Sequence, residues 1–205
     1  MGKKFLSLFL MILFSLSVIS ATVVRGRVTV KGSDTMVILV QRLAEEYMLK
    51  NRGKIVQVTG GGTGTGIAGL INKVTDIANA SRPLTDKERE AIKKTWGKDP
   101  KEIRIALDGI TIYVNPSNPL KEISLGQLKE IYTGKIKSWK ELGWEDKPII
   151  VYTRENNSGT YVFFKEYVLN NEDYTSKAQS LPGTGGIVNA VSKEKYSIGY
   201  GGIAY

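Results

Sequence analysis

The stretch 154–160, Arg-Glu-Asn-Asn-Ser-Gly-Thr, contains the residue types that hold an anion. It follows an apolar run over 148–152, which we expect to be a buried strand, and it precedes an expected helix over 161–169. The first turn of a helix offers unpaired N–H groups and the positive end of the helix dipole. Arg154 adds a guanidinium whose fork matches two oxygens of a phosphate or carboxylate. The loop is therefore predicted to bind an oxyanion. The alternative is that Ser158 only caps the helix and Arg154 is solvated.

Composition excludes several kinds of chemistry. The chain of 205 residues has no histidine and no cysteine. It therefore has no Ser-His-Asp or Cys-His centre, no histidine-based zinc site and no disulfide. An Asp-x-Asp-x-Asp calcium loop is also absent from the sequence. We expect neither a metal nor a cofactor.

Residues 1–21 are predicted to be a secretory signal peptide. Lys3 and Lys4 precede an apolar run from Phe5 to Ile19. That run is too short and too close to the start for a typical membrane-spanning helix, although an uncleaved anchor is the alternative. The protein is therefore expected to be periplasmic or otherwise extracytoplasmic, and soluble after cleavage.

The charge balance is compatible with an anionic ligand. The formal net charge is +9, of which Lys3 and Lys4 supply two. Basic residues elsewhere are scattered among acids, as in 86–90, which is typical of a solvated helix face. A nucleic-acid partner is not expected, because no basic stripe with interleaved aromatic residues is present.

Strands, polar turns and helices alternate along the sequence, which predicts an α/β fold with a mostly parallel sheet. Ligands of such sheets bind beyond the carboxyl ends of the strands, where these turns lie. The long apolar stretch 103–114 is expected to be one strand that crosses between two lobes and bends at Asp108-Gly109. Strands are predicted near 28–30, 55–58, 76–80, 103–114, 148–152 and 197–205. Helices are predicted at 36–49 (with Ile38, Leu39, Leu43 and Tyr47 at helical spacing), around 67–71, and at 85–95, 124–132, 161–169 and 187–192.

The turn after the second strand satisfies the G-x-G-x-x-G pattern over 64–69, which taken alone suggests a dinucleotide site. Three features argue against that interpretation. The protein is predicted to be exported from the cytoplasm, the strand before the turn is not the first of its sheet, and no acidic residue ends a following strand about twenty residues further on. No Gly-Lys-Ser/Thr ending is present, so the turn is not a Walker P-loop either. Glycines allow close approach of the backbone, and Thr63 and Thr65 add hydroxyl donors. These features favour a small oxyanion.

An ordered set of motifs resembles the phosphate-binding receptors of Pst ABC transporters, a family of two-lobed type 2 solute-binding proteins. The resemblance covers nearly all of the sequence after residue 21. Its motifs are Gly32–Met36, Gly62–Gly66, Ala80–Leu84, Asp108-Gly109, Asn115–Pro119, Arg154–Thr160, Gly183–Gly186 and Ser197–Tyr200. It implies lobe I over 22–108 and lobe II over 109–205 with a return strand at its end. Because the family continues beyond that strand, the first lobe is expected to be incomplete and the protein to be truncated at its C-terminal end.

The resemblance also implies a binding shell for inorganic phosphate. The donors it implies are Thr35, the Met36 amide and Thr63 from the first lobe, with Arg154, Ser158, the Gly159 amide and Thr160 from the second. Well-studied family members have an aspartate at the position of Ser81, and that aspartate accepts the phosphate proton. Ser81 is therefore placed in the shell, and Asp34 is an alternative proton acceptor. Family members often have an acid two residues after the arginine, where this protein has Asn156, so Glu155 is the candidate partner of Arg154.

The implied function is that of a receptor, not an enzyme, which delivers phosphate to the membrane permease of an ABC importer. Two alternatives stay open. One is a receptor for another oxyanion such as sulfate. The other is a secreted phosphoryl-transfer enzyme that uses the same donors, although it would lack histidine, cysteine and an evident metal cluster.

Overall fold

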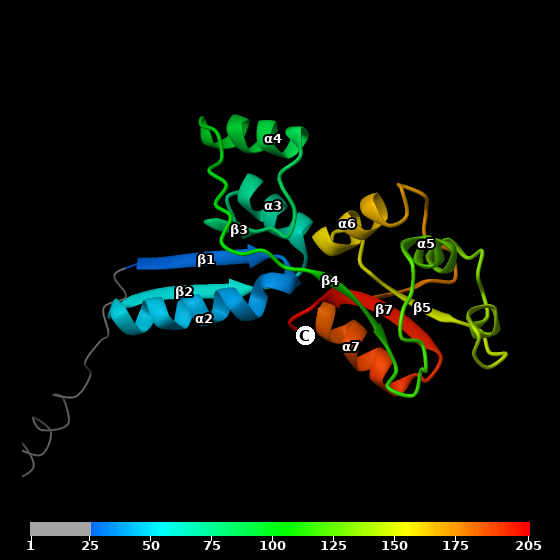
Figure 1. The fold of residues 1–205 in the computed structure, drawn as a ribbon. Coiled ribbons are helices and arrows are strands. Elements are labelled where there is room, and N and C mark those ends of the chain that lie inside the picture. Colours follow the sequence, from blue (N-terminus) through cyan, green and yellow to red (C-terminus); the bar gives the residue numbers. More distant parts are fainter. Residues whose placement is uncertain (1–25) are drawn as a thin grey trace, which may run out of the picture.

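The computed structural model describes residues 26–205, so the predicted signal peptide lies outside the described residues. These residues form two separate β-sheets, each with its own helices, and the two units lie side by side (Figure 1). We call β1 to α4 the N-terminal lobe and β4 to β7 the C-terminal lobe. The predicted α/β class is confirmed. Among the described residues, none of the helices combines the length and apolar character that a membrane crossing requires.

The N-terminal lobe contains a fully parallel sheet of order β2-β1-β3. Each strand runs into a polar turn and then a helix, as the alternation of patterns predicts, so the three turns collect at one edge of the sheet. Its strands are β1 (Gly26–Gly32), β2 (Lys54–Thr59) and β3 (Ile77–Asn79). Its helices are α2 (Asp34–Lys50), α3 (Thr63–Ile71) and α4 (Asp86–Trp96).

The C-terminal lobe has a mixed sheet of order β4-β7-β5-β6, in which only β4 and β7 are antiparallel. The short strand β6 and the 3-10 helix η1 were not predicted, since each spans too few residues to show a period. Its strands are β4 (Ile110–Val114), β5 (Ile150–Arg154), β6 (Gln179–Leu181) and β7 (Ser197–Gly202). Its helices are α5 (Leu125–Thr133), η1 (Trp139–Leu142), α6 (Gly159–Tyr167) and α7 (Gly183–Lys193).

An aromatic core supports the sheet of the C-terminal lobe. Phe164 of α6 stacks on Tyr200 of the buried central strand β7, with ring centroids 3.9 Å apart. The Tyr200 hydroxyl lies 2.9 Å from the Thr153 hydroxyl and 2.8 Å from that of Tyr174. Because both rings and hydroxyls are engaged, this core fixes the end of β5, where Arg154 follows Thr153.

The long strand predicted over 103–114 is wrong in its first half. Only Ile110–Val114 pairs in a sheet, and the ladder with β7 begins at Ile110 opposite Gly202. Ile103, Ile105 and Leu107 are 68%, 49% and 86% exposed. Their alternation is strand-like, but among the described residues no neighbouring strand pairs with them. The predicted bend at 108–109 lies directly before β4, and the lobe boundary placed there stays a prediction.

Helix α2 forms where predicted, but its apolar stripe does not face the sheet. Val40 and Ala44, one turn apart, are its buried residues. The predicted stripe of Ile38, Leu39, Leu43 and Tyr47 lies outward, with each residue more than 40% exposed. Helical spacing therefore identified the helix and not the side that packs.

The turn that carries Ser81 is tied to α4 by an ion pair. Both terminal nitrogens of Arg82 donate to the Glu88 carboxylate at 2.8 Å. Thr85 and Glu88 also form a capping box at the start of α4. The Arg82 guanidinium, together with the bonds from Thr85, lowers the pKa of Glu88 from 4.5 to about 2.

Substituting Glu88→Gln should therefore reduce stability in a pH-dependent way. We expect a loss of about 1–2 kcal/mol at pH 7, a value discounted for partial exposure of the pair. A depressed pKa contributes stability above the unfolded value and loses it as pH falls from about 4.5 towards 2. Urea unfolding over this range, with the exposed Glu90→Gln as control, should show the deficit of the Glu88 variant shrinking at low pH. A deficit independent of pH would contradict this assignment.

Candidate functional site

The predicted anion-binding residues gather where the two lobes face each other. The first turns of α2 and α3 point towards those of α6 and α7 (Figure 1). The Thr35 hydroxyl lies 2.9 Å from that of Thr160 on the other lobe. The Thr63 hydroxyl lies 3.2 Å from that of Ser81 and also accepts a bond from the Ser81 amide. Strand-to-helix turns from both sheets thus deliver hydroxyls to one place.

Arg154 ends β5 and is 1% exposed. One terminal nitrogen donates to the Thr184 hydroxyl and the other to a carboxylate oxygen of Asp34, both at 3.0 Å. The prediction that Glu155 pairs with Arg154 is wrong. The Glu155 carboxylate accepts from the Gly183 amide at 3.4 Å instead. Successive side chains of an extended segment point to opposite sides, so residue 155 turns away from the guanidinium.

Asp34 is held from two directions. Its Oδ1 accepts from the Gly61 amide at 2.8 Å, and its Oδ2 accepts from Arg154. Its side chain keeps 20% of its surface exposed. Each carboxylate oxygen can accept a further hydrogen bond, so the arrangement leaves acceptor capacity at this position.

Ser158 does cap a helix, as the simpler interpretation of the loop predicted. Its hydroxyl accepts from the Tyr161 amide at 3.3 Å at the start of α6. Arg154, however, is buried and not solvated, so that interpretation is right for the serine and wrong for the arginine. Met36, at the start of α2, donates its amide to the Ser33 carbonyl at 3.2 Å.

Gly159 lies in tight contact with the N-terminal lobe. A Cβ atom there would lie 2.4 Å from the Ser81 hydroxyl and 2.6 Å from that of Thr63. Only glycine therefore fits, and it brings the first residue of α6 against the polar turns of the N-terminal lobe.

Sequence reasoning assigned no role to two residues of this region, Thr184 and Asn157. Thr184 lies in the glycine-rich motif 183–186 and holds Arg154. Asn157 donates to the Gly61 carbonyl at 3.0 Å and to the Thr65 hydroxyl at 2.9 Å. Thr65, predicted as a donor to an anion, is thus an acceptor for Asn157. No periodic signal marks contacts of this kind, because they join residues distant in sequence.

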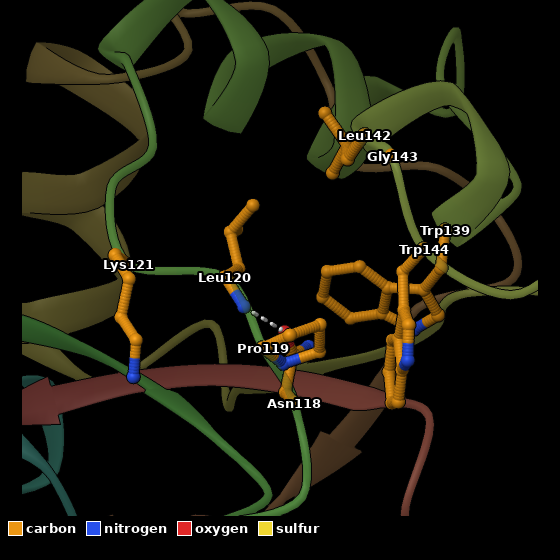
Figure 2. A pocket seen from close by; sticks show the side chains of 8 residues that line it. All are labelled: Asn118, Pro119, Leu120, Lys121, Trp139, Leu142, Gly143 and Trp144. Carbon is orange, nitrogen blue, oxygen red and sulfur yellow. Dashed lines mark hydrogen bonds between the residues drawn. The ribbon is translucent and has the colours of Figure 1, made fainter.

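A separate pocket of about 200 Å³ lies within the C-terminal lobe, between the segment 118–121 and two tryptophans, Trp139 and Trp144 (Figure 2). Asn118 accepts a bond from the Leu120 amide at its edge, at 2.9 Å. None of the predicted anion-binding residues lines it. The polar cluster between the lobes is therefore the candidate functional site.

Comparison with known proteins gives consistent results. Residues 19–205 match the family model of the PBP superfamily domain. A "Phosphate-binding protein PstS" from Staphylococcus epidermidis is 37% identical over 181 residues, covering 87% of this chain and 55% of the relative. This chain therefore spans about half the length of the curated relatives it matches.

Solved structures resemble the protein as well. A phosphate ABC transporter substrate-binding protein from Clostridium perfringens, solved with bound phosphate, is 36% identical with a TM-score of 0.80. The match covers 87% of this chain and 71% of that one. An ABC-type phosphate transport receptor from Vibrio cholerae is 30% identical with a TM-score of 0.64, covering 86% and 71%.

Replacing Asp34 with Asn tests which acid neutralises Arg154. Removal of the carboxylate charge leaves the buried guanidinium without its counter-charge, so the free energy of unfolding should fall by about 2–3 kcal/mol. Glu155→Gln is the matched control and should change it by less than about 0.5 kcal/mol. Chemical denaturation at neutral pH measures both. A larger loss for Glu155→Gln than for Asp34→Asn would refute the pairing.

Proposed function

This chain belongs to the PBP superfamily, and we propose that it is a receptor that holds inorganic phosphate between its lobes for an ABC importer. It would act outside the cytoplasmic membrane and deliver the ion to the membrane permease. The observation that carries the proposal is the convergence of a buried arginine with hydroxyls and helix starts from both lobes. The names of the phosphate-binding relatives support the choice of ion.

The proposed shell consists of the predicted residues: Thr35, Met36, Thr63, Ser81, Arg154, Ser158, Gly159 and Thr160. Hydroxyls that now pair with each other, such as those of Thr35 and Thr160, can rotate to donate to an anion. The Met36 amide would exchange its bond to Ser33 for one to the ion. A buried anion needs such a complete set of donors, since each missing bond costs the desolvation of that oxygen.

Arg154 is the one cationic residue of the proposed shell, and Asp34 already pairs with it. The Nε of Arg154 is buried and finds no hydrogen-bond partner among the described residues, so one N–H of the guanidinium is not yet used. Its terminal nitrogens are already engaged by Asp34 and Thr184. The ion would therefore meet a guanidinium that is fixed in place, which lowers the entropic cost of binding.

Selectivity for phosphate over sulfate would rest on a proton acceptor. At neutral pH phosphate carries a proton and sulfate does not, so an acceptor in the shell favours phosphate, and an unpaired acceptor facing sulfate disfavours it. The two groups placed to accept are the Asp34 carboxylate and the Ser81 hydroxyl. Of these, the carboxylate is the stronger acceptor.

Binding would close the lobes about the segment at Asp108-Gly109. An ion shifts that equilibrium only by binding the closed form more tightly than the open one.

A receptor function is proposed over phosphoryl transfer because Ser158 serves as a helix cap and the Thr160 hydroxyl pairs with that of Thr35. Neither hydroxyl is paired with a general base.

Isothermal titration calorimetry with phosphate tests this function. The wild-type protein should bind phosphate, and Arg154→Ala should weaken binding at least about 100-fold, because charge-assisted hydrogen bonds are lost. The exposed Arg104→Ala is the matched control and should bind like wild type. Circular dichroism verifies that each variant is folded. Absence of phosphate binding by the wild type, or turnover of phosphate esters, would refute the proposal.

Competition with sulfate separates the two proton acceptors. If Ser81 accepts the proton, Ser81→Ala should weaken phosphate binding about tenfold and spare sulfate; Asp34→Asn gives that pattern if the carboxylate accepts it. Calorimetry at pH 7.5 with each ion measures the two affinities. Equal losses for both ions in both variants would exclude a proton acceptor at either position.

A further inference from the structure

Asn157 makes three hydrogen bonds across the interface between the lobes, all to one turn. Its side-chain Nδ2 donates to the Gly61 carbonyl at 3.0 Å and to the Thr65 hydroxyl at 2.9 Å. Its own carbonyl accepts from the Gly64 amide at 2.9 Å. We infer that Asn157 is a positioning residue that latches the lobes together at the edge of the proposed phosphate site, an inference that rests on the proposed function.

The glycine-rich turn is shaped to receive this residue. Gly62 has φ +88°, and a Cβ there would lie 3.0 Å from the Asn157 carbonyl oxygen. A Cβ on Gly64 would lie 3.3 Å from the same oxygen. The lack of a side chain at Gly62 and Gly64 thus allows the C-terminal lobe to approach the turn. Gly64 is also the first glycine of the G-x-G-x-x-G pattern, so the glycines of this turn are explained without a bound nucleotide.

The orientation of the Asn157 amide is fixed by its partners. A backbone carbonyl can only accept, so the group that faces Gly61 must be the NH₂ and not the oxygen. The Oδ1 atom is buried and has no hydrogen-bond partner among the described residues. The side chain therefore acts through its donors, and alanine removes both.

The Asn157 contacts share no atom with the proposed phosphate shell. The hydroxyls and guanidinium of the shell can turn to an anion while the three bonds to the turn stay in place. The latch therefore stabilises the closed arrangement both with and without the ion. An ion can enter or leave only while the lobes are apart, so the latch should slow both association and dissociation.

The first test needs no ligand. The protein has no cysteine, so spin labels can be placed at Glu90→Cys on α4 and Glu166→Cys on α6, both exposed and on different lobes. Double electron–electron resonance of the ligand-free protein should show longer distances for Asn157→Ala than for wild type. Asn156→Ala, which removes the exposed asparagine one residue earlier, should leave the distribution unchanged. Identical distributions for all three proteins would overturn the latch.

The second test measures rates with inorganic phosphate. Asn157→Ala should raise the dissociation rate constant about tenfold, equivalent to ~1.4 kcal/mol, and should also raise the association rate constant, because the ligand-free lobes separate more often. Thr65→Val should give a smaller increase, and adding it to Asn157→Ala should change nothing further. Additive effects, or an equal change in Asn156→Ala, would contradict the inference. If the wild type binds no phosphate the proposed function fails, whereas the distance measurement still decides the latch.

Discussion

One buried ion pair joins the two lobes at the candidate site. Arg154 is almost completely excluded from solvent, and a guanidinium in that position is tolerated only when it is paired and hydrogen-bonded. Its carboxylate partner, Asp34, belongs to the other lobe and is itself held by the Gly61 amide. The aromatic core beneath β5 fixes the arginine from one side, and the start of α2 fixes the aspartate from the other. Because the charges already balance, neutral hydroxyls and amides must supply much of the attraction for an added anion.

Local patterns predicted the elements of the fold well, because strand runs, glycine turns and helix starts are encoded within a few residues. The loop 154–160 and the helix starts that face it could be located for the same reason. The partner of Arg154 could not, because Asp34 is 120 residues away in sequence and only folding brings them together. Proximity in sequence favoured Glu155, but adjacent residues of an extended segment point apart.

Two further predictions differ from the structure for one physical reason. An apolar pattern in the sequence does not reveal which element will pack against it. The alternation over 103–109 is typical of a strand, yet a strand exists only where another strand pairs with it, and pairing begins at Ile110. The outward stripe of α2 likewise has helical spacing, whereas Val40 and Ala44 are the residues that face inward. Periodicity identifies an element more reliably than it identifies the neighbour against which the element packs.

The link between the lobes has a consequence for how weak contacts act together. Gly109 lies directly before β4, and its carbonyl accepts from the Ile203 amide at 2.9 Å just after β7. The last residue then returns to the N-terminal lobe, where the Tyr205 hydroxyl donates to the Asp34 carbonyl at 2.7 Å. The hydrogen-bonding groups of one lobe are thus held close to those of the other lobe. Each group therefore encounters its partner on the other lobe at a high effective concentration. Hydrogen bonds that would be negligible between separate molecules can therefore determine whether the two halves stay together.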